Sequence, residues 1–222
     1  MKRSGVLLAA FVFVILSYGS AFALNYSFAG NFVYDDDVQM FSFRLDTQSD
    51  VTLKTYSYAG GTDAAGNIIA RGGFDPVLAL FNSAGVLLDI SLDGYYPEVE
   101  MDSVSGQYWD DYFTALLDPG IYFVSLMQYD NLPVGTNLAD GFVREGQQYF
   151  TRDFAIGDDS GNFYDTSGML GNARDGHYAF DILNVAYATE GTDIAPIPEP
   201  CTMVLLGAGL GLMGFVRRRQ TA

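Results

Sequence analysis

Apolar and polar residues alternate in several short stretches of the chain. Phe41-Ser42-Phe43-Arg44-Leu45 alternates in this way, and so does Tyr178-Ala179-Phe180-Asp181-Ile182. Because successive side chains of a β-strand point to opposite faces, each stretch can bury one face and expose the other. No window shows the sustained spacing that indicates an amphipathic helix. Both stretches are therefore predicted to be strands.

Turn residues separate further apolar runs. Residues 82–85 (Asn-Ser-Ala-Gly) stand between Val77–Phe81 and Val86–Leu88, which is the arrangement of a hairpin. Asp118-Pro119-Gly120 likewise leads into the apolar run Ile121–Met127. The 25 glycines and 15 tyrosines fit short strands joined by frequent turns. We therefore predict an all-β fold, an antiparallel β-sandwich of the jelly-roll type, as an ectodomain over residues 24–190.

The N-terminus carries an apolar run of a different kind. Two basic residues precede Val6–Leu16, and the segment ends in the small-x-small triplet Ala21-Phe22-Ala23. This order predicts a secretory signal peptide at residues 1–23, cleaved after Ala23. An uncleaved anchor is the alternative, although the apolar run falls well short of the roughly 20 residues that span a bilayer.

The C-terminus carries a second apolar run, Met203–Val216, followed by three arginines, Arg217, Arg218 and Arg219. As a helix this run would span about 21 Å, against roughly 30 Å of hydrocarbon. It predicts a short transmembrane helix whose arginines reach the headgroups. The positive-inside rule places both basic ends in the cytoplasm and the middle of the chain outside.

Pro198-Glu199-Pro200 stands just before this run, after a predicted linker at residues 191–198. With the Gly/Leu-rich segment and the terminal arginines, the predicted sorting domain at residues 199–222 and the two residues before it resemble the PEP-CTERM sorting signal of Gram-negative bacteria. The resemblance implies transient anchoring in the inner membrane and recognition of Pro198, Glu199 and Pro200 by exosortase, a transpeptidase. Cys201 departs from the small residue usual at its position. A replacement for serine and a site of acylation both fit it.

Composition limits the partners and sites of the middle of the chain. Residues 24–198 carry six basic and 26 acidic residues, a net charge of −20, so nucleic acid is not an expected partner. The single cysteine excludes an internal disulfide, and the single histidine excludes a multi-histidine metal site. We expect His177 to be an exposed residue at a turn rather than a general base.

A second resemblance covers about residues 30–130. Asp35-Asp36-Asp37, Gly73-Phe74-Asp75-Pro76 and Leu117-Asp118-Pro119-Gly120 are similar to parts of the bacterial pre-peptidase C-terminal domain. That resemblance implies a β-sandwich. Residues 131–190 resemble a family of uncharacterised ectodomains that precede such sorting tails, which implies no activity. We expect them to complete or flank the same sandwich.

The loop Asp89–Glu100 is the best candidate for a ligand site. Counted from its first residue, it offers oxygens at positions 1, 3, 5, 7 and 12, the spacing of a calcium-binding loop. The residues at these positions are Asp89, Ser91, Asp93, Tyr95 and Glu100. Serine at position 3, Pro97 and the lack of predicted flanking helices depart from the pattern, so a solvated acidic loop is the alternative. We expect Asp35–Asp37 and Asp110-Asp111 to be solvated loop charges.

Enzymatic activity is not expected. The chain has no GxSxG motif, and Asp165-Thr166-Ser167-Gly168 is one residue away from an aspartic-protease triplet that has no second copy. The 27 acidic residues leave open the alternative of a catalytic carboxylate pair, as in a polysaccharide hydrolase. Aromatic residues near the acidic loop fit a sugar-binding surface as well as a core. They are Tyr95, Tyr96, Tyr108, Trp109 and Tyr112.

The sequence therefore predicts an exported structural protein, processed by exosortase and delivered to the cell surface, the envelope or an exopolysaccharide biofilm matrix. A calcium-assisted carbohydrate-binding module is the alternative, and a polysaccharide-active hydrolase is the third reading. The expected partners are exosortase, the inner membrane and exopolysaccharide. Calcium is the single candidate cofactor.

Overall fold

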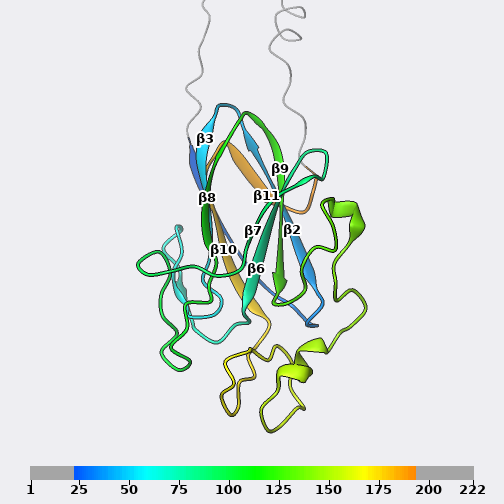
Figure 1. Cartoon of the computed structure of the whole chain (residues 1–222). Coiled ribbons are helices and arrows are strands. Elements are labelled where there is room, and N and C mark those ends of the chain that lie inside the picture. The colour runs from blue at the N-terminus through cyan, green and yellow to red at the C-terminus, as the bar shows by residue number, and fades with distance from the viewer. Residues whose placement is uncertain (1–22, 194–222) are drawn as a thin grey trace, which may run out of the picture.

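The structure is a computed structural model that describes residues 23–193 (Figure 1). Ala21 of the predicted signal peptide, Pro198-Glu199-Pro200, the predicted transmembrane helix and Arg217–Arg219 lie outside these residues. Among residues 23–193, no helix is long and apolar enough to cross a membrane.

Two antiparallel sheets form a sandwich. In spatial order, the first sheet contains β1 (Leu24–Asn31), β10 (His177–Val185), β3 (Ser49–Thr55) and β8 (Tyr112–Leu117). The second contains β11 (Tyr187–Glu190), β2 (Val38–Leu45), β9 (Gly120–Gln128), β6 (Pro76–Asn82) and β7 (Leu87–Ser91). A separate hairpin pairs β4 (Gly61–Thr62) with β5 (Ile68–Ile69). The all-β, antiparallel prediction is confirmed.

The connections between the sheets follow a regular plan. Without the β4–β5 hairpin and the edge strand β11, eight strands remain. The first, eighth, third and sixth of these form one sheet, and the second, seventh, fourth and fifth form the other. This strand order is that of a jelly roll. The helical elements of the described residues are two 3-10 segments, η1 (Leu138–Asp140) and η2 (Phe150–Phe154).

The alternating stretches of the sequence form the core between the sheets. Phe41 and Phe43 of β2 pack against Phe180 and Ile182 of β10, and all four are fully buried. The rings of Phe41 and Phe180 lie 4.9 Å apart. Because one face of each strand enters the core, the period of two in the sequence fixes which residues are buried.

β6 is buried on both faces, which its unbroken apolar sequence reflects. Leu78 and Leu80 enter the core between the sheets. Val77, Ala79 and Phe81 pack on the outer face of the second sheet, under a segment that includes Leu132 and Phe142. The part of the chain beyond residue 131 thus covers one sheet and then supplies β10 and β11.

The long connections gather at one end of the sandwich. Figure 1 shows both ends of the described chain leaving at the opposite end. The register agrees, because Leu24 of β1 pairs with Val185 of β10, two residues before β11 begins. We call the other end, where residues 56–75, 92–111 and 143–176 lie, the loop end.

Candidate functional site at the loop end

Buried aspartates are the most unusual feature of the loop end and its surroundings. Eight aspartate side chains are buried: Asp35, Asp63, Asp75, Asp102, Asp110, Asp111, Asp165 and Asp181. A buried carboxylate is costly unless it is paired or accepts hydrogen bonds. The prediction that Asp35 and Asp110-Asp111 are solvated loop charges is therefore wrong. The loops fold back over these residues, which no local sequence pattern indicates.

Asp35 holds η2 and the segment after it against the sandwich. Its Oδ2 accepts hydrogen bonds from the backbone N–H and the hydroxyl of Thr151, and its Oδ1 accepts one from the N–H of Phe163, at 2.9 Å. One carboxylate thus joins two loop segments that are distant in the sequence. Its neighbour Asp37 caps the turn instead, accepting from the N–H groups of Val33 and Tyr34.

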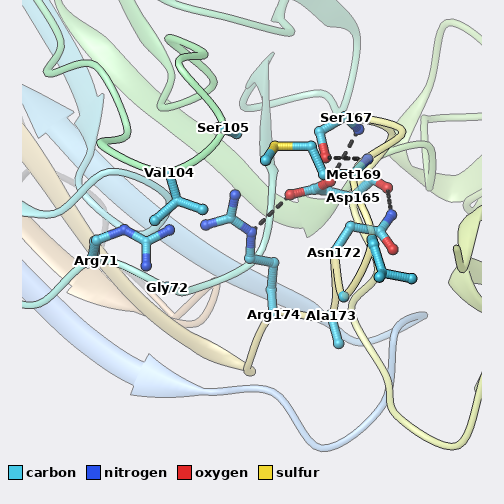
Figure 2. A pocket seen from close by; sticks show the side chains of 12 residues that line it. Arg71, Gly72, Val104, Ser105, Asp165, Ser167, Met169, Asn172, Ala173 and Arg174 are labelled. Atoms are coloured by element: carbon cyan, nitrogen blue, oxygen red, sulfur yellow. Dashed lines mark hydrogen bonds and ion pairs between the residues drawn. The ribbon is translucent and has the colours of Figure 1, made fainter. Parts of the chain in front are cut away.

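A cluster of ion pairs joins three loops beside a small cavity. Arg174 Nε lies 2.7 Å from Asp165 Oδ2, and Arg174 Nη2 lies 3.3 Å from Asp102 Oδ2. Arg71 Nε contacts the other oxygen of Asp102 at 2.5 Å. The guanidinium of Arg174 also lies over the ring of Tyr58, 3.8 Å from its centroid. Figure 2 shows the guanidinium of Arg174 joined to Asp165, with Arg71 and Val104 on the other side of Arg174. The cavity measures about 150 Å³.

These contacts keep the cluster charged. Burial by itself would raise the pKa of Asp102, but hydrogen bonds from Arg71 and Ser105 and the charge of Arg174 outweigh it. The pKa of Asp102 therefore lies well below its ordinary value. Burial raises the pKa of Tyr58, whose hydroxyl donates to Asp165 Oδ2 at 2.9 Å. Such a paired network is suited to holding loops in place rather than to transferring protons at neutral pH.

Two further buried carboxylates accept hydrogen bonds from neighbouring groups. Asp110 Oδ1 accepts from the hydroxyl of Thr55 at 2.9 Å, and its Oδ2 accepts from the N–H of Ala59 at 2.8 Å. Asp181 Oδ2 accepts from the hydroxyl of Tyr56 and from the N–H of Ala64, both at 2.8 Å. Both aspartates anchor residues 55–64, which include β4, onto the first sheet.

The residues of the predicted calcium loop do not surround a common point. β7 continues through Ser91, so the first three positions run as a strand instead of turning around an ion. Asp89 is exposed, whereas Ser91 is buried and donates to Asp111 at 2.6 Å. Asp93, Tyr95 and Glu100 are exposed. Within residues 23–193, no group of three or more His, Cys, Asp or Glu side chains has a geometry that could hold a metal ion.

Partial burial nevertheless affects one residue of this loop. It raises the pKa of Asp93 to about 6.

His177 and the aromatic residues near the acidic loop differ in how far they are buried. His177 was expected to be exposed at a turn, but it begins β10 and is half-buried, with Nδ1 paired to Asp175 and Nε2 at 3.0 Å from the carbonyl oxygen of Ala70. Among the aromatic residues near the acidic loop, Tyr95 is 60% and Tyr96 is 75% exposed. The rest of this group are half-buried, and Trp109 packs against Tyr58 with ring centroids 5.2 Å apart.

No curated protein matches the chain. Residues 196–220 match the PEP-CTERM protein-sorting motif. The match contains the Pro-Glu-Pro sequence and the arginines that the sequence analysis assigned to the sorting signal. This motif implies an exported precursor that is anchored in the membrane and processed by exosortase.

Proposed function

We propose that this protein is a structural component of the cell surface or the exopolysaccharide matrix, released from its membrane precursor by exosortase. The sorting motif at residues 196–220 is the observation that carries the proposal. It begins six residues after β11 ends at Glu190, so the chain passes from the sandwich almost directly into the sorting signal.

The charge of the sandwich supports this role. Residues 24–198 carry a net charge of −20, and 18 of their 26 acidic residues are not buried. A surface with this density of carboxylates is strongly hydrated and repels other acidic chains, which keeps a secreted protein dispersed in a hydrated matrix.

The position of the chain ends on the sandwich also supports a role at the cell surface. The two chain ends leave at the end opposite the loop end (Figure 1). An anchor attached through residues 191–198 would therefore present the loop end outward. The loops at that end are held by buried carboxylates, so they offer a fixed surface rather than a flexible one.

On this proposal the protein is not an enzyme. Asp102 and Asp165, the carboxylates nearest the cavity, are committed to ion pairs with Arg71 and Arg174. The similarity of about residues 30–130 to the pre-peptidase C-terminal domain is also part of the proposal and rests on the sequence.

The sorting step can be tested with Glu199→Ala. We expect the unprocessed precursor to accumulate in the membrane, measured as a mass difference of the C-terminal segment by mass spectrometry of the intact protein. Glu190→Ala, which removes an acid outside the motif, is the matched control and should be processed normally. Normal processing of Glu199→Ala would refute the sorting step of the proposal.

A second candidate is carbohydrate binding at the loop end. Tyr95 and Tyr96 expose large ring surfaces next to acidic residues, and such rings can stack on sugars. Calcium assistance from the loop Asp89–Glu100 belongs to this candidate. Tyr96→Ala should then abolish binding to a glycan array, while Tyr187→Ala, an exposed tyrosine of β11, should not. Equal binding by both variants would exclude this surface.

A further inference from the structure

Three buried oxygen atoms near the start of β6 have no hydrogen-bond partner among the described residues. They are Asp75 Oδ1, Asp111 Oδ2 and Gln128 Oε1. Asp75 is 4% exposed, and Asp111 and Gln128 are fully buried. Buried polar atoms in folded proteins almost always have a partner, so each of these atoms needs an explanation. Among residues 23–193, Asp181 also has one oxygen, Oδ1, without a partner, whereas Asp35, Asp102, Asp110 and Asp165 have their partners within the protein.

Asp75 and Gln128 are brought together by the pairing of β6 with β9. The N–H of Tyr129 donates to the carbonyl oxygen of Asp75 at 2.9 Å, and Pro76 lies opposite Gln128 in the ladder. Gln128 follows Leu126 by two positions on β9, and Leu126 is part of the core between the sheets. The side chain of Gln128 therefore points between the two sheets beside the start of β6.

Asp111 approaches the start of β6 from the side of the first sheet. It immediately precedes β8 of the first sheet, and its Oδ1 accepts a hydrogen bond from Ser91 Oγ of the second sheet at 2.6 Å. Ser91 lies opposite Leu78 in the pairing of β7 with β6, two residues from Pro76. The second oxygen of Asp111 is the one without a partner.

The carboxylates at this place repel each other. Burial raises the pKa of Asp75 and of Asp111 well above the ordinary value, and the charge of Asp93 raises both further. Gly94 donates its N–H to the carbonyl oxygen of Asp110 at 2.7 Å, which keeps Asp93 beside them. None of the lysine and arginine side chains within residues 23–193 forms a salt bridge with either buried carboxylate.

We propose that Asp75 Oδ1, Asp111 Oδ2 and Gln128 Oε1 bind one hard divalent cation of the calcium class between the two sheets. An all-oxygen donor set with two carboxylates and one amide carbonyl is the kind that calcium prefers, with water oxygens completing its six to eight ligands. The cation supplies the missing partner of all three atoms and offsets the repulsion.

This site differs from the loop Asp89–Glu100 and does not depend on sorting or carbohydrate binding. The proposed ligand set contains only two carboxylates and one amide. It is therefore consistent with the finding that no three acidic, histidine or cysteine side chains form a metal group in the described part of the chain. The cation would tie β8 of the first sheet to β6 and β9 of the second. It would therefore stabilise the loop end of the sandwich.

The test uses the full chain, purified in detergent, treated with chelator and then titrated with calcium chloride. Isothermal titration calorimetry should give one calcium per chain. At a free calcium concentration about 100-fold above the dissociation constant, the melting temperature should rise by roughly 5–10 °C. Asp111→Asn and Asp75→Asn should each abolish both the heat of binding and the shift. Because asparagine is neutral, we expect these variants to remain folded without calcium.

Asp89→Asn is the matched control, since it removes an exposed carboxylate of β7 and should leave calcium binding intact. Loss of binding in Asp89→Asn with retention in Asp111→Asn would overturn the proposal in favour of the surface loop. Weak binding of several ions, unchanged in every variant, would also overturn it, because that result reflects the acidic surface alone. An absence of both heat and shift in the unmodified chain would do so without any variant.

Discussion

Replacing Arg174 with methionine tests the role of the ion-pair cluster. Methionine keeps most of the apolar stem but removes the charge, and the side chain of Arg174 is only 7% exposed. Breaking a buried ion pair by removing one partner costs about 3–5 kcal/mol, because it leaves an uncompensated charge. Asp102 keeps Arg71, and Asp165 keeps the hydroxyl of Tyr58, so we place the cost at the lower end, about 3 kcal/mol.

For a chain of this size, about 3 kcal/mol corresponds to a loss of roughly 6–12 °C in melting temperature. The fluorescence of Trp109 is a suitable probe, since this residue packs against Tyr58 beside the cluster. Arg71→Met is the matched control. Its side chain is 37% exposed, so the ion pair that it loses is partly screened by solvent and should cost about 1 kcal/mol or less.

A second substitution separates the charge from the packing. Adding Asp165→Asn to Arg174→Met removes the carboxylate left unpaired and should restore more than half of the lost stability. Equal costs for Arg174→Met and Arg71→Met, or no recovery in the double variant, would refute the view that the cluster is held by buried charge pairing.

The pH dependence gives an independent readout. The pKa of Asp102 is lowered in the folded protein, so its contribution to stability is present above the unfolded pKa of about 3.9 and is lost as the pH falls below it. Arg174→Met weakens this lowering. The variant should therefore lose less stability than the unmodified protein between neutral and acidic pH, measured by denaturant unfolding at each pH.

Two further substitutions test other parts of the loop end. Asp35→Ala removes the acceptor that joins two loop segments and should cost about 2–4 kcal/mol in urea unfolding, with faster amide exchange in residues 149–164, whereas Asp36→Ala should cost less than about 0.5 kcal/mol. Gly73→Ala would place a Cβ 2.4 Å from the carbonyl oxygen of His177 and should cost about 1–3 kcal/mol, while Gly120→Ala, whose Cβ would meet only a side chain at 3.5 Å, should cost less than about 1 kcal/mol. Equal costs within either pair would contradict the assigned contacts.

The strands that the sequence indicated were predictable because they are encoded locally. The alternation at residues 41–45 and 178–182 and the hairpin turn at residues 82–85 all appear in the structure as β2, β10 and the β6–β7 connection. A period of two is a property of neighbouring residues, and burying one face of a strand requires it. The sorting motif was equally readable, since its residues act as a contiguous segment.

The buried aspartates were not predictable in this way. Asp35, Asp110 and Asp111 occur in polar stretches that resemble solvated loops, and their burial depends on partners up to 128 residues away. The predicted exposure of His177 was wrong for a similar reason, because its contact with the carbonyl oxygen of Ala70 joins residues that are 107 positions apart.

The sequence by itself determined that the chain is built from antiparallel strands and that its end carries a sorting signal, because both are written in residues that are neighbours along the chain. Only the tertiary structure decided which acidic residues are buried and which form ion pairs with arginine. Ser91 and Asp111 come from different sheets, and so do the three unpaired oxygens of Asp75, Asp111 and Gln128. The folding of one sheet onto the other creates these contacts, and no local pattern records them.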